Sequence, residues 1–576
     1  MKLLLLHPED GFQSSWANDR YDLIVDLGRA PAAFYHDWSR KLGCPVFSIF
    51  DLAVEVDDFR EWRDLMDVGR GQVVDRFGID WWDVIGLMLQ PELQDMRLVQ
   101  RLSRKVGACD GLTVTRPSPL AKALGLQLQC PVTVLYGGVP RRLSRKLGRY
   151  RRAAANLGFR QLRQVLYDKY DAHYVWRRRF APAPGKSSDP VILLPSAYIN
   201  VTRTAFRYAE VLPHRRCLLV LAREIGNVSP APENVRTEFL ASFAAAGSDL
   251  AELRQLENSW EGLRSSLGAH EEFALGVRIG SLNHGGRWLR WAIAVRDAWN
   301  AVFESRAIVG CLSADDSNPY TRIPLLLARE RGIPAIACHH GALDGVMAFK
   351  KPAFSTYLVK GEMEHDYLTR VCRVDNKLLR IGAPFNGAVV PSLWSDHAPF
   401  IVFFTEPYET DLWRVEAIYR ELMPRLCAVA RRAGKRVLVK LHPFESKRQR
   451  QQMVNKTLQE EDRHLVSVTD APLSRQILEQ TWCAVTVEST TAFECAAGGI
   501  PAFLCGWLRH AYYGYAPQYA RFGVGQMLEA PDDLLNIPEM LASAIPADGL
   551  RERLLQAIHP DEFEEILCRP ARATLR

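Results

Sequence analysis

Two adjacent histidines, His339 and His340, follow a short apolar run and stand directly before Gly341. Histidine titrates near neutrality, so at the end of a strand it can take a proton from a hydroxyl group. Gly341 allows the chain to turn sharply and to approach a ligand closely. The pattern predicts His340 as a general base, with Asp344 as the alternative base. A structural histidine that is bonded to backbone groups is the competing interpretation.

A third histidine stands in the sequence VLVKLHP, which ends in His442-Pro443. A hydrogen-bond donor at the end of an apolar strand can bind a phosphate or stabilise a leaving group. A lone His-Pro pair is weak evidence, since the pair also occurs at His7-Pro8. The position of His442 before another polar motif makes it a candidate site residue.

That motif, ESTT, leads from an apolar run into a helical pattern. Hydroxyls and free N–H groups at a helix start suit a phosphate, so Ser489, Thr490 and Thr491 are predicted phosphate ligands. Glu494 lies one turn on, on the same helix face, and is predicted to bind a ribose diol. Helix capping alone is the competing interpretation. Glu406 follows another apolar run and is predicted to face the same ligand.

Short apolar runs alternate with longer amphipathic ones along the chain. This alternation is typical of parallel sheets with crossover helices, which would position these residues. Such sheets bind ligands beyond the carboxyl ends of their strands, where the polar motifs stand. The predicted strands are Lys2–His7, Asp22–Asp26, Val46–Phe50, Gly111–Thr115, Val132–Tyr136, Val191–Pro195, Cys217–Ala222, Ile308–Leu312, Ala335–His339, Thr356–Val359, Leu378–Ile381, Phe400–Phe404, Val437–Leu441, Leu465–Val468, Ala484–Val487 and Ala502–Leu504.

The predicted fold is α/β, with two facing Rossmann-like domains, an additional N-terminal α/β region and helical insertions. The N-terminal region spans residues 1–140, and a basic helical linker spans 141–187. The Rossmann-like domains span 188–395 and 396–545, and a mostly helical insertion covers 233–303 of the first. A helical tail is expected over 546–576. A ligand cleft is expected between the two Rossmann-like domains.

Composition excludes several classes of protein. The chain is 48% hydrophobic and 24% charged, with a formal net charge of +7, as in ordinary globular proteins. Its twelve cysteines form no CxxC pair, so neither a zinc site nor a redox motif is predicted. No apolar stretch reaches the length of about 18 residues that a spanning helix needs, and buried, reduced cysteines predict a cytoplasmic protein. Without a GxxxxGK[ST] loop or a DxD triplet at a strand end, neither a P-loop NTPase nor a bound metal is expected.

Basic residues crowd the segment Arg141–Arg179, which contains only Asp168 and Asp171 as acidic residues. One interpretation is a solvated linker helix. The other is an interfacial patch that binds an anionic acceptor or the anionic inner face of a membrane, which would make the protein peripheral there. No recognition motif accompanies the charge, so nucleic acid is not a predicted partner.

The stretch from Ile333 to Trp507 resembles GT-B glycosyltransferases of surface and capsular polysaccharide synthesis. The nearest groups are capsular Kdo transferases, bacterial sialyltransferases and CDP-glycerol glycerophosphotransferases. His340-Gly341 matches the His-Gly pair that provides the base in the last group. His442-Pro443 looks like the HP motif of all three groups, and Ser489-Thr490 looks like their serine/threonine phosphate motif. The residues from Phe493 to Pro501 match the pattern that follows.

Three departures leave the donor and the base open. His339 stands where glycerophosphotransferases usually have tryptophan, and the sequence EST replaces their Asp-Tyr-Ser-Ser. Leu343-Asp344-Gly345 is the nearest match to the acidic-acidic-Gly motif of sialyltransferases.

The resemblance implies a glycosyltransferase, or a glycerophosphotransferase-like enzyme, that moves a nucleotide-activated sugar to a saccharide or glycolipid acceptor. No metal or other cofactor is implied, because the nucleotide-sugar donor, of CMP, CDP or UDP type, is itself a substrate. The donor is expected on the 396–545 domain, with His442 beside the departing phosphate. The acceptor is expected on the 188–395 domain, where His340 or Asp344 would deprotonate its hydroxyl. A nucleotide-sugar 2-epimerase and a non-catalytic polysaccharide-assembly protein with the same fold are the alternatives.

Overall fold

The computed structural model describes residues 1–8, 10–28, 30–52, 63–135, 185–223, 230–243, 249–384, 392–406, 412–443, 445–508 and 513–568. The chain divides into two compact units. The first contains residues 1–58, 95–138 and 388–554, and the second contains 59–94, 139–387 and 555–576. The basic segment Arg141–Arg179, and with it nearly all of the predicted linker 141–187, lies outside the described residues.

The N-terminal sheet, in the first unit, consists of five parallel strands in the order β3-β2-β1-β4-β5. These strands are β1 (Lys2–Leu6), β2 (Leu23–Asp26), β3 (Val46–Ser48), β4 (Gly111–Val114) and β5 (Val132–Val134). The helices of this region are α1 (Ala32–Leu42), α3 (Trp81–Val106) and α4 (Pro119–Leu128). Leu4, Leu6 and Ile24 are completely buried in its core, which explains the apolar start of the chain.

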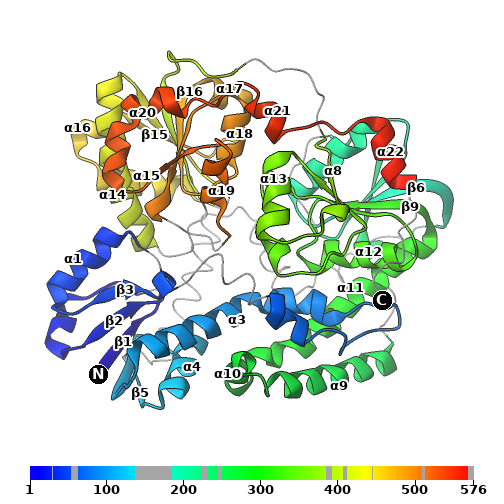
Figure 1. The fold of residues 1–576 in the computed structure, drawn as a ribbon, viewed down its shortest axis with the longest axis horizontal. Helices are drawn as coiled ribbons and strands as arrows, with labels where there is room; N and C mark the ends of the chain where they lie inside the picture. The colour runs from blue at the N-terminus through cyan, green and yellow to red at the C-terminus, as the bar shows by residue number, and fades with distance from the viewer. Residues whose placement is uncertain are drawn as a thin grey trace. The chain divides into compact units, whose positions relative to one another are not determined.

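The middle sheet, in the second unit, has seven parallel strands in the order β12-β11-β10-β9-β6-β7-β8. They are β6 (Ser187–Ser196), β7 (Cys217–Leu221), β8 (Val235–Phe239), β9 (Arg306–Ser313), β10 (Ala335–Ala337), β11 (Thr356–Val359) and β12 (Leu379–Ile381). Figure 1 shows helices α8 (Ile199–Val211), α12 (Pro319–Glu330) and α13 (Glu362–Asp366) around β6 and β9. Buried apolar side chains of β6, β7 and α8 form one core with those of α22 (Pro560–Cys568).

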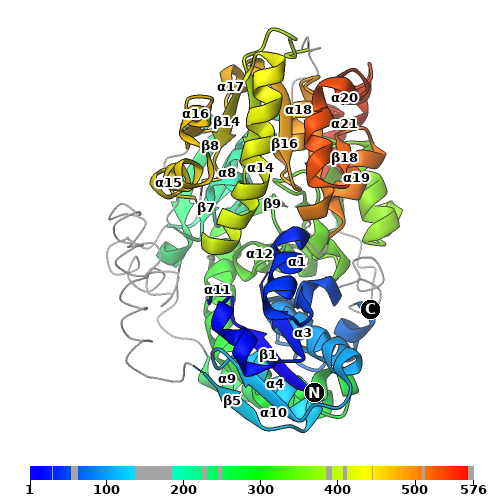
Figure 2. The same ribbon diagram turned by 90° about the vertical axis from the view of Figure 1, so that its left-hand side faces the viewer.

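The C-terminal sheet, in the first unit, has six parallel strands in the order β15-β14-β13-β16-β17-β18. They are β13 (Phe400–Phe404), β14 (Arg436–Lys440), β15 (Val466–Thr469), β16 (Thr481–Thr486), β17 (Ala502–Cys505) and β18 (Gln526–Leu528). The long helix α14 (Leu412–Ala433) can be followed in Figure 2, and its buried apolar side chains form one core with those of the sheet. Val437 and Val439 point to that face. Successive side chains alternate along a strand, so Leu438 and Lys440 point to the other face.

The predicted α/β class and its two Rossmann-like domains are confirmed. In chain order, the middle sheet reads 7-6-5-4-1-2-3 and the C-terminal sheet 3-2-1-4-5-6, the Rossmann strand order in each case. All sixteen predicted strands are present, most with ends shifted by a residue or two. The N-terminal sheet, predicted only as an α/β region, has the same order, 3-2-1-4-5.

The structure adds two strands to the predicted elements and divides the chain into units of its own. The insertion 233–303 is not wholly helical, because it begins with β8 before α9 (Leu250–Leu267), α10 (Glu271–Ile279) and α11 (Gly285–Ser305). β8 is an edge strand with only two buried side chains, so it has no apolar run to reveal it. β18 is three residues long and was not predicted either. Residues 63–94 fall in the second unit, whereas residues 1–52 and 95–135 fall in the first. Near the C-terminal end, residues 546–554 fall in the first unit and residues 555–568 in the second, where α22 packs with the middle sheet.

Candidate functional site

The strand order reverses at one point in each of the two Rossmann-like sheets, between β6 and β9 and between β13 and β16. Connections from two neighbouring strands leave in opposite directions at such a point, which opens a crevice at their carboxyl ends. The residues that follow β6, β9 and β10 include Tyr198, Asp315 and His340. Those that follow β13, β14 and β16 include Glu406, His442 and Ser489. The predicted site residues therefore stand at the two positions where such sheets bind ligands.

His340 is half-buried and contacts two residues from the neighbouring strand ends. Its Nδ1 lies 3.2 Å from the hydroxyl of Tyr198 and 3.4 Å from the carbonyl oxygen of Ala314. The two rings meet edge to face, with centroids 5.1 Å apart. Burial lowers the pKa of His340, and the nearby carboxylate of Asp315 only partly offsets this. A neutral imidazole at neutral pH can accept a proton, as a general base must.

His339 packs against His340, with ring centroids 4.4 Å apart, but it makes a different contact. Its Nδ1 accepts a hydrogen bond from the backbone N–H of Gly341 at 3.2 Å. That bond places the ring proton of the neutral His339 on Nε2. Burial is also the main cause that lowers the pKa of His339 well below its usual value. His339 is therefore a hydrogen-bond donor at Nε2, whereas His340 is available as an acceptor.

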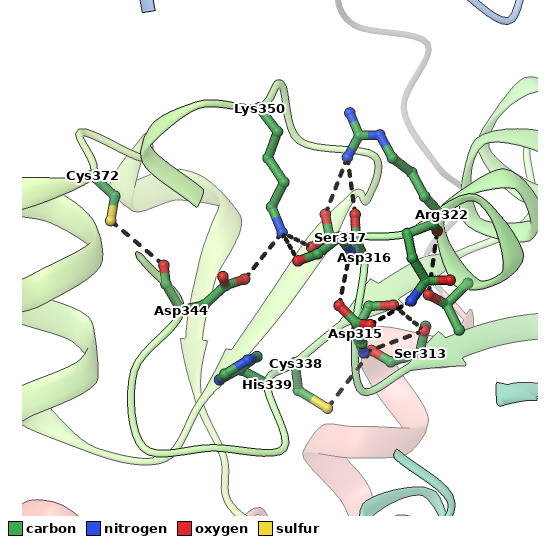
Figure 3. Close-up of polar contacts among 12 residues, drawn as sticks. Ser313, Asp315, Asp316, Ser317, Arg322, Cys338, His339, Asp344, Lys350 and Cys372 are labelled. Carbon is green, nitrogen blue, oxygen red and sulfur yellow. Dashed lines mark hydrogen bonds and ion pairs between the residues drawn. The ribbon is translucent and has the colours of Figure 1, made fainter. Parts of the chain in front are cut away.

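Asp344, the alternative base, is ion-paired (Figure 3). Its side chain lies 3.1 Å from the ammonium of Lys350, which also contacts Asp316 and the Ser317 hydroxyl. Lys350 has no exposed side-chain surface, and Asp344 is 2% exposed. Burial lowers the pKa of Lys350, but Asp316 and Asp344 outweigh burial and raise it overall. A carboxylate held by a buried cation is a poor base, so the geometry favours His340.

The loop after β9 is held by a second buried cation and by a helix cap. Arg322 of α12 approaches the side chain of Asp316 at 3.4 Å and donates to the carbonyl of Lys351 at 2.7 Å. Asn318 caps α12 by accepting from the backbone N–H of Tyr320 at 3.1 Å, with a proline at the first helical position. These contacts fix the loop that carries Asp315.

His442 begins a loop whose backbone is held by hydrogen bonds to nearby side chains. Its backbone N–H donates to the Thr405 hydroxyl at 3.1 Å and to the Glu445 carboxylate at 2.9 Å. Glu445 is in turn bonded to Arg450 at 2.8 Å, and both side chains are buried. Burial lowers the pKa of the His442 imidazole, with only partial compensation from Glu445. The backbone at His442 is therefore fixed while its ring is neutral.

The predicted hydroxyls surround the start of α18 (Thr491–Ala497). Ser489 Oγ accepts from the N–H of Thr491 at 3.3 Å and from its hydroxyl at 3.0 Å, which is a capping contact. Thr490 is exposed and makes no capping bond, and Glu494 is exposed one turn on. The capping interpretation is thus present for Ser489, and phosphate binding by these hydroxyls stays a prediction.

Glu406 lies beside this same loop, as predicted. Its carboxylate accepts from the N–H of Glu488 at 2.6 Å and from the Thr486 hydroxyl at 3.3 Å. Burial raises the pKa of Glu406 to about 7, and these hydrogen bonds limit the rise. A group that changes charge near neutrality therefore stands among the predicted phosphate ligands.

Lys440, which the sequence analysis did not single out, is the last residue of β14 and is 7% exposed. Its ammonium donates to the carbonyl of Leu441 at 2.5 Å, and it forms no ion pair with any described residue. Burial lowers its pKa, while Asp470, Glu445 and Glu494 act on it only at longer range. The one feature of the sequence that could have identified Lys440 is that a lysine interrupts an otherwise apolar strand. A buried cation without a carboxylate partner is costly unless an anion binds it.

Two absences concern the described part of the chain. Within it, no group of three or more His, Cys, Asp or Glu side chains could hold a metal ion. None of its helices combines the length and the apolar character that crossing a membrane requires.

Comparison with known proteins places only distant likenesses beside this chain. No family model and no curated protein sequence matches it. Similar solved structures include the spinosyn rhamnosyltransferase SpnG, with 13% identity and a TM-score of 0.36 over 66% of this chain and 99% of that one. The glycotransferase of kitacinnamycin has 13% identity and a TM-score of 0.41 over 66% and 99% of the two chains. A UDP-glucose:anthocyanidin 3-O-glucosyltransferase in complex with UDP has 11% identity and a TM-score of 0.37 over 66% and 94%. At this level of similarity, function has to be inferred from the residues of the chain itself.

Proposed function

We propose that this protein is a glycosyltransferase of the GT-B class that moves a sugar from a nucleotide-activated donor to a hydroxyl acceptor. One pair of observations carries the proposal: the middle sheet presents a neutral histidine, His340, after β10, and the C-terminal sheet presents a buried cation, Lys440, that forms no ion pair with any described residue. A base for a hydroxyl and a site for an anionic leaving group are the two requirements of glycosyl transfer from a nucleotide sugar.

The donor would be held by the C-terminal sheet. The phosphates of the donor would accept hydrogen bonds from the Lys440 ammonium and from the hydroxyls of Ser489, Thr490 and Thr491. Glu494 would bind the ribose diol. A CMP-, CDP- or UDP-sugar fits this set, because each carries phosphate next to a ribose. The proposal is supported by the burial of Lys440, at the end of the strand β14 that pairs with β13, and by the position of the hydroxyl residues after β16, at the β13/β16 switch point.

In the reaction, the acceptor hydroxyl would lose its proton to His340 as its oxygen forms a bond to the anomeric carbon. The bond from that carbon to the donor phosphate would break, and its electron pair would stay on the phosphate oxygen. His442 would donate a hydrogen bond to this oxygen as its negative charge grows. Lys440 supplies fixed positive charge at the same sheet edge, so we propose that the transfer needs no metal ion.

The acceptor class follows from the motif resemblance: a surface polysaccharide, such as a capsule, or a glycolipid. We further propose a cytoplasmic protein that contacts the inner membrane face through Arg141–Arg179. The density of arginine and lysine in that segment supports such contact with anionic lipid.

The test begins with the purified protein and a thermal-shift panel of CMP, CDP, UDP and GDP. A nucleotide at a hundred times its Kd should stabilise the protein by about 2.7 kcal/mol, which is readily seen. The sugar esters of the stabilising nucleotide are then supplied with and without saccharide acceptors, and released nucleotide is measured. Acceptor-dependent release supports the proposal. Conversion of the donor without acceptor would identify an epimerase. No stabilisation by any nucleotide would support a non-catalytic assembly protein.

A further inference from the structure

Within the described residues, the two hydrogen-bonding contacts of Nδ1 of His340 are both with oxygen atoms. One is the carbonyl oxygen of Ala314 at 3.4 Å, which can only accept a hydrogen bond. The other is the hydroxyl oxygen of Tyr198 at 3.2 Å. A neutral histidine that meets a carbonyl at Nδ1 gains a hydrogen bond only when Nδ1 carries the proton. The surroundings therefore select one of the two neutral tautomers.

The hydroxyl of Tyr198 has its own direction fixed by Asp315. It donates to the Asp315 carboxylate at 3.0 Å, which leaves a lone pair of its oxygen toward His340. The same carboxylate accepts from the N–H of Ser317 at 2.8 Å and from the Asn318 amide at 2.6 Å. With three donors around it, Asp315 acts as a fixed acceptor.

The backbone at Tyr198 is equally constrained. Its carbonyl accepts from the N–H of Thr202 in the first turn of α8, at 3.1 Å. The hydroxyls of Ser196 and Thr202 contact each other at 2.7 Å, and each lies 3.3 Å from that carbonyl. Tyr198 thus stands at the junction of β6 and α8, with its ring edge-to-face on His340.

We propose that Asp315 and Tyr198 form a hydrogen-bond relay that holds His340 with its proton on Nδ1, so that Nε2 is the atom that removes the acceptor proton. This inference rests on the proposed function and adds two positioning residues to it. The direction of donation is Nδ1–H to the Tyr198 oxygen and Tyr198 O–H to Asp315. When Nε2 takes the acceptor proton, the ring becomes an imidazolium, and the relay stabilises it through the carboxylate. No proton has to leave Tyr198 or Asp315.

The relay can be tested without turnover by ¹⁵N NMR of the protein labelled at histidine, with His340 assigned from the spectrum of His340→Gln. The neutral tautomer of His340 should carry its proton on Nδ1. His339 is an internal control of the opposite kind, because its Nδ1 accepts from Gly341. Replacing Asp315→Asn offers an N–H to the Tyr198 oxygen, turns the tyrosine proton toward His340 and should shift the tautomer toward Nε2–H. A proton on Nε2 of His340 in the unmodified protein would overturn the inference, whatever the protein catalyses.

The kinetic test uses Tyr198→Phe, which removes the hydroxyl and keeps the ring. We expect kcat to fall by about tenfold with little change in the acceptor KM, because a fraction of the general-base contribution is lost. The acid limb of kcat/KM should move to lower pH, since the imidazolium loses its acceptor. The charges near His340 from Asp315, Asp344 and Lys360, and the packed ring of His339, are unchanged by this substitution.

The control is Tyr357→Phe, on β11 of the same sheet. The Tyr357 hydroxyl is buried and has no hydrogen-bond partner among the described residues, so its loss should leave kcat and the pH profile unchanged. Asp315→Asn should cost about 10²-fold in kcat, and adding it to Tyr198→Phe should cost far less than the two single losses combined. Additive losses, or a pH profile of Tyr198→Phe that coincides with the unmodified profile, would refute the relay.

Discussion

The two Rossmann-like sheets each carry a buried lysine, and the contacts of the two lysines differ. After β9 and β10, Lys350 is paired with Asp316 and Asp344. At the end of β14, Lys440 is also buried, yet it bonds only to the carbonyl of its neighbour Leu441 among the described residues. Within the described residues, Lys350 has carboxylates in direct contact, whereas carboxylates act on Lys440 only at longer range. The difference indicates that internal ion pairs hold the loops around the proposed base in the middle sheet. In the C-terminal sheet, the buried lysine remains available to an anionic ligand.

The largest expected effect is on stability, and it should distinguish substitutions of the two lysines. Lys350→Met leaves Asp344 buried without its cation and leaves Asp316 with Arg322 at 3.4 Å, so we expect it to lower the free energy of unfolding by about 3–5 kcal/mol. Lys440→Met keeps the aliphatic stem and removes a buried charge that has no ion-pair partner among the described residues. It should leave the free energy of unfolding of the nucleotide-free protein within about 1 kcal/mol, or raise it. Scanning calorimetry of both variants measures this difference. Equal decreases in the free energy of unfolding would contradict the contrast between the two lysines.

Substitutions of His340 and His442 should lower kcat by similar factors but should affect the pH dependence of the rate differently. His340→Gln and His442→Gln should each lower kcat for transfer by about 10²-fold or more, the scale for a base or a charge stabiliser. Only His340→Gln should abolish the acid limb of the rate profile. That limb should lie below the usual histidine range, since burial lowers the pKa of His340. Rates measured from pH 5 to 8 with a saturating donor distinguish the two roles, and near-normal turnover in both variants would remove the assignment.

Lys440→Met should weaken donor binding by about tenfold or more, because a fully desolvated charge pair to phosphate is lost. The effect should appear in the donor Kd, measured by calorimetry with the nucleotide alone. Arg436→Met, at the exposed first residue of β14, serves as the matched loss of charge and should leave the Kd unchanged. Equal Kd values for Lys440→Met and the unmodified protein would contradict the anion site.

The smallest effect is the pH dependence that Glu406 gives to the C-terminal sheet. Its folded pKa, raised to about 7, exceeds the ordinary glutamate value, so the folded state binds this proton more tightly than the unfolded state. The associated stability is present at low pH and is lost as pH rises toward about 7. Nucleotide affinity should fall over the same upper range, since ionised Glu406 repels phosphate. Titrations from pH 6 to 8 should show this fall, and Glu406→Gln should flatten it.

Much of the fold was predictable because strand and helix periods are local. The β13 run Phe400–Phe404 and the β11 run Thr356–Val359 were predicted with the bounds that the structure shows. The edge strand β8 was missed because exposure leaves no apolar run. Among site residues, polar groups after buried strands could be found by position, and His340 is one of them. Tyr198 could not, because nothing near it in sequence indicates that its hydroxyl meets a histidine 142 residues away.

The sequence by itself determined which residues end the strands and which chemical groups they carry, because alternation and turn residues act over a few positions. Only the tertiary structure decided how these groups are completed. The order of the strands brings Tyr198 to Asp315, 117 residues apart, and leaves Lys440 buried without an ion-pair partner in the described part of the chain. The physical reason is that a tautomer, an ion pair or an uncompensated charge depends on distances between segments, and those are fixed only when the sheets assemble.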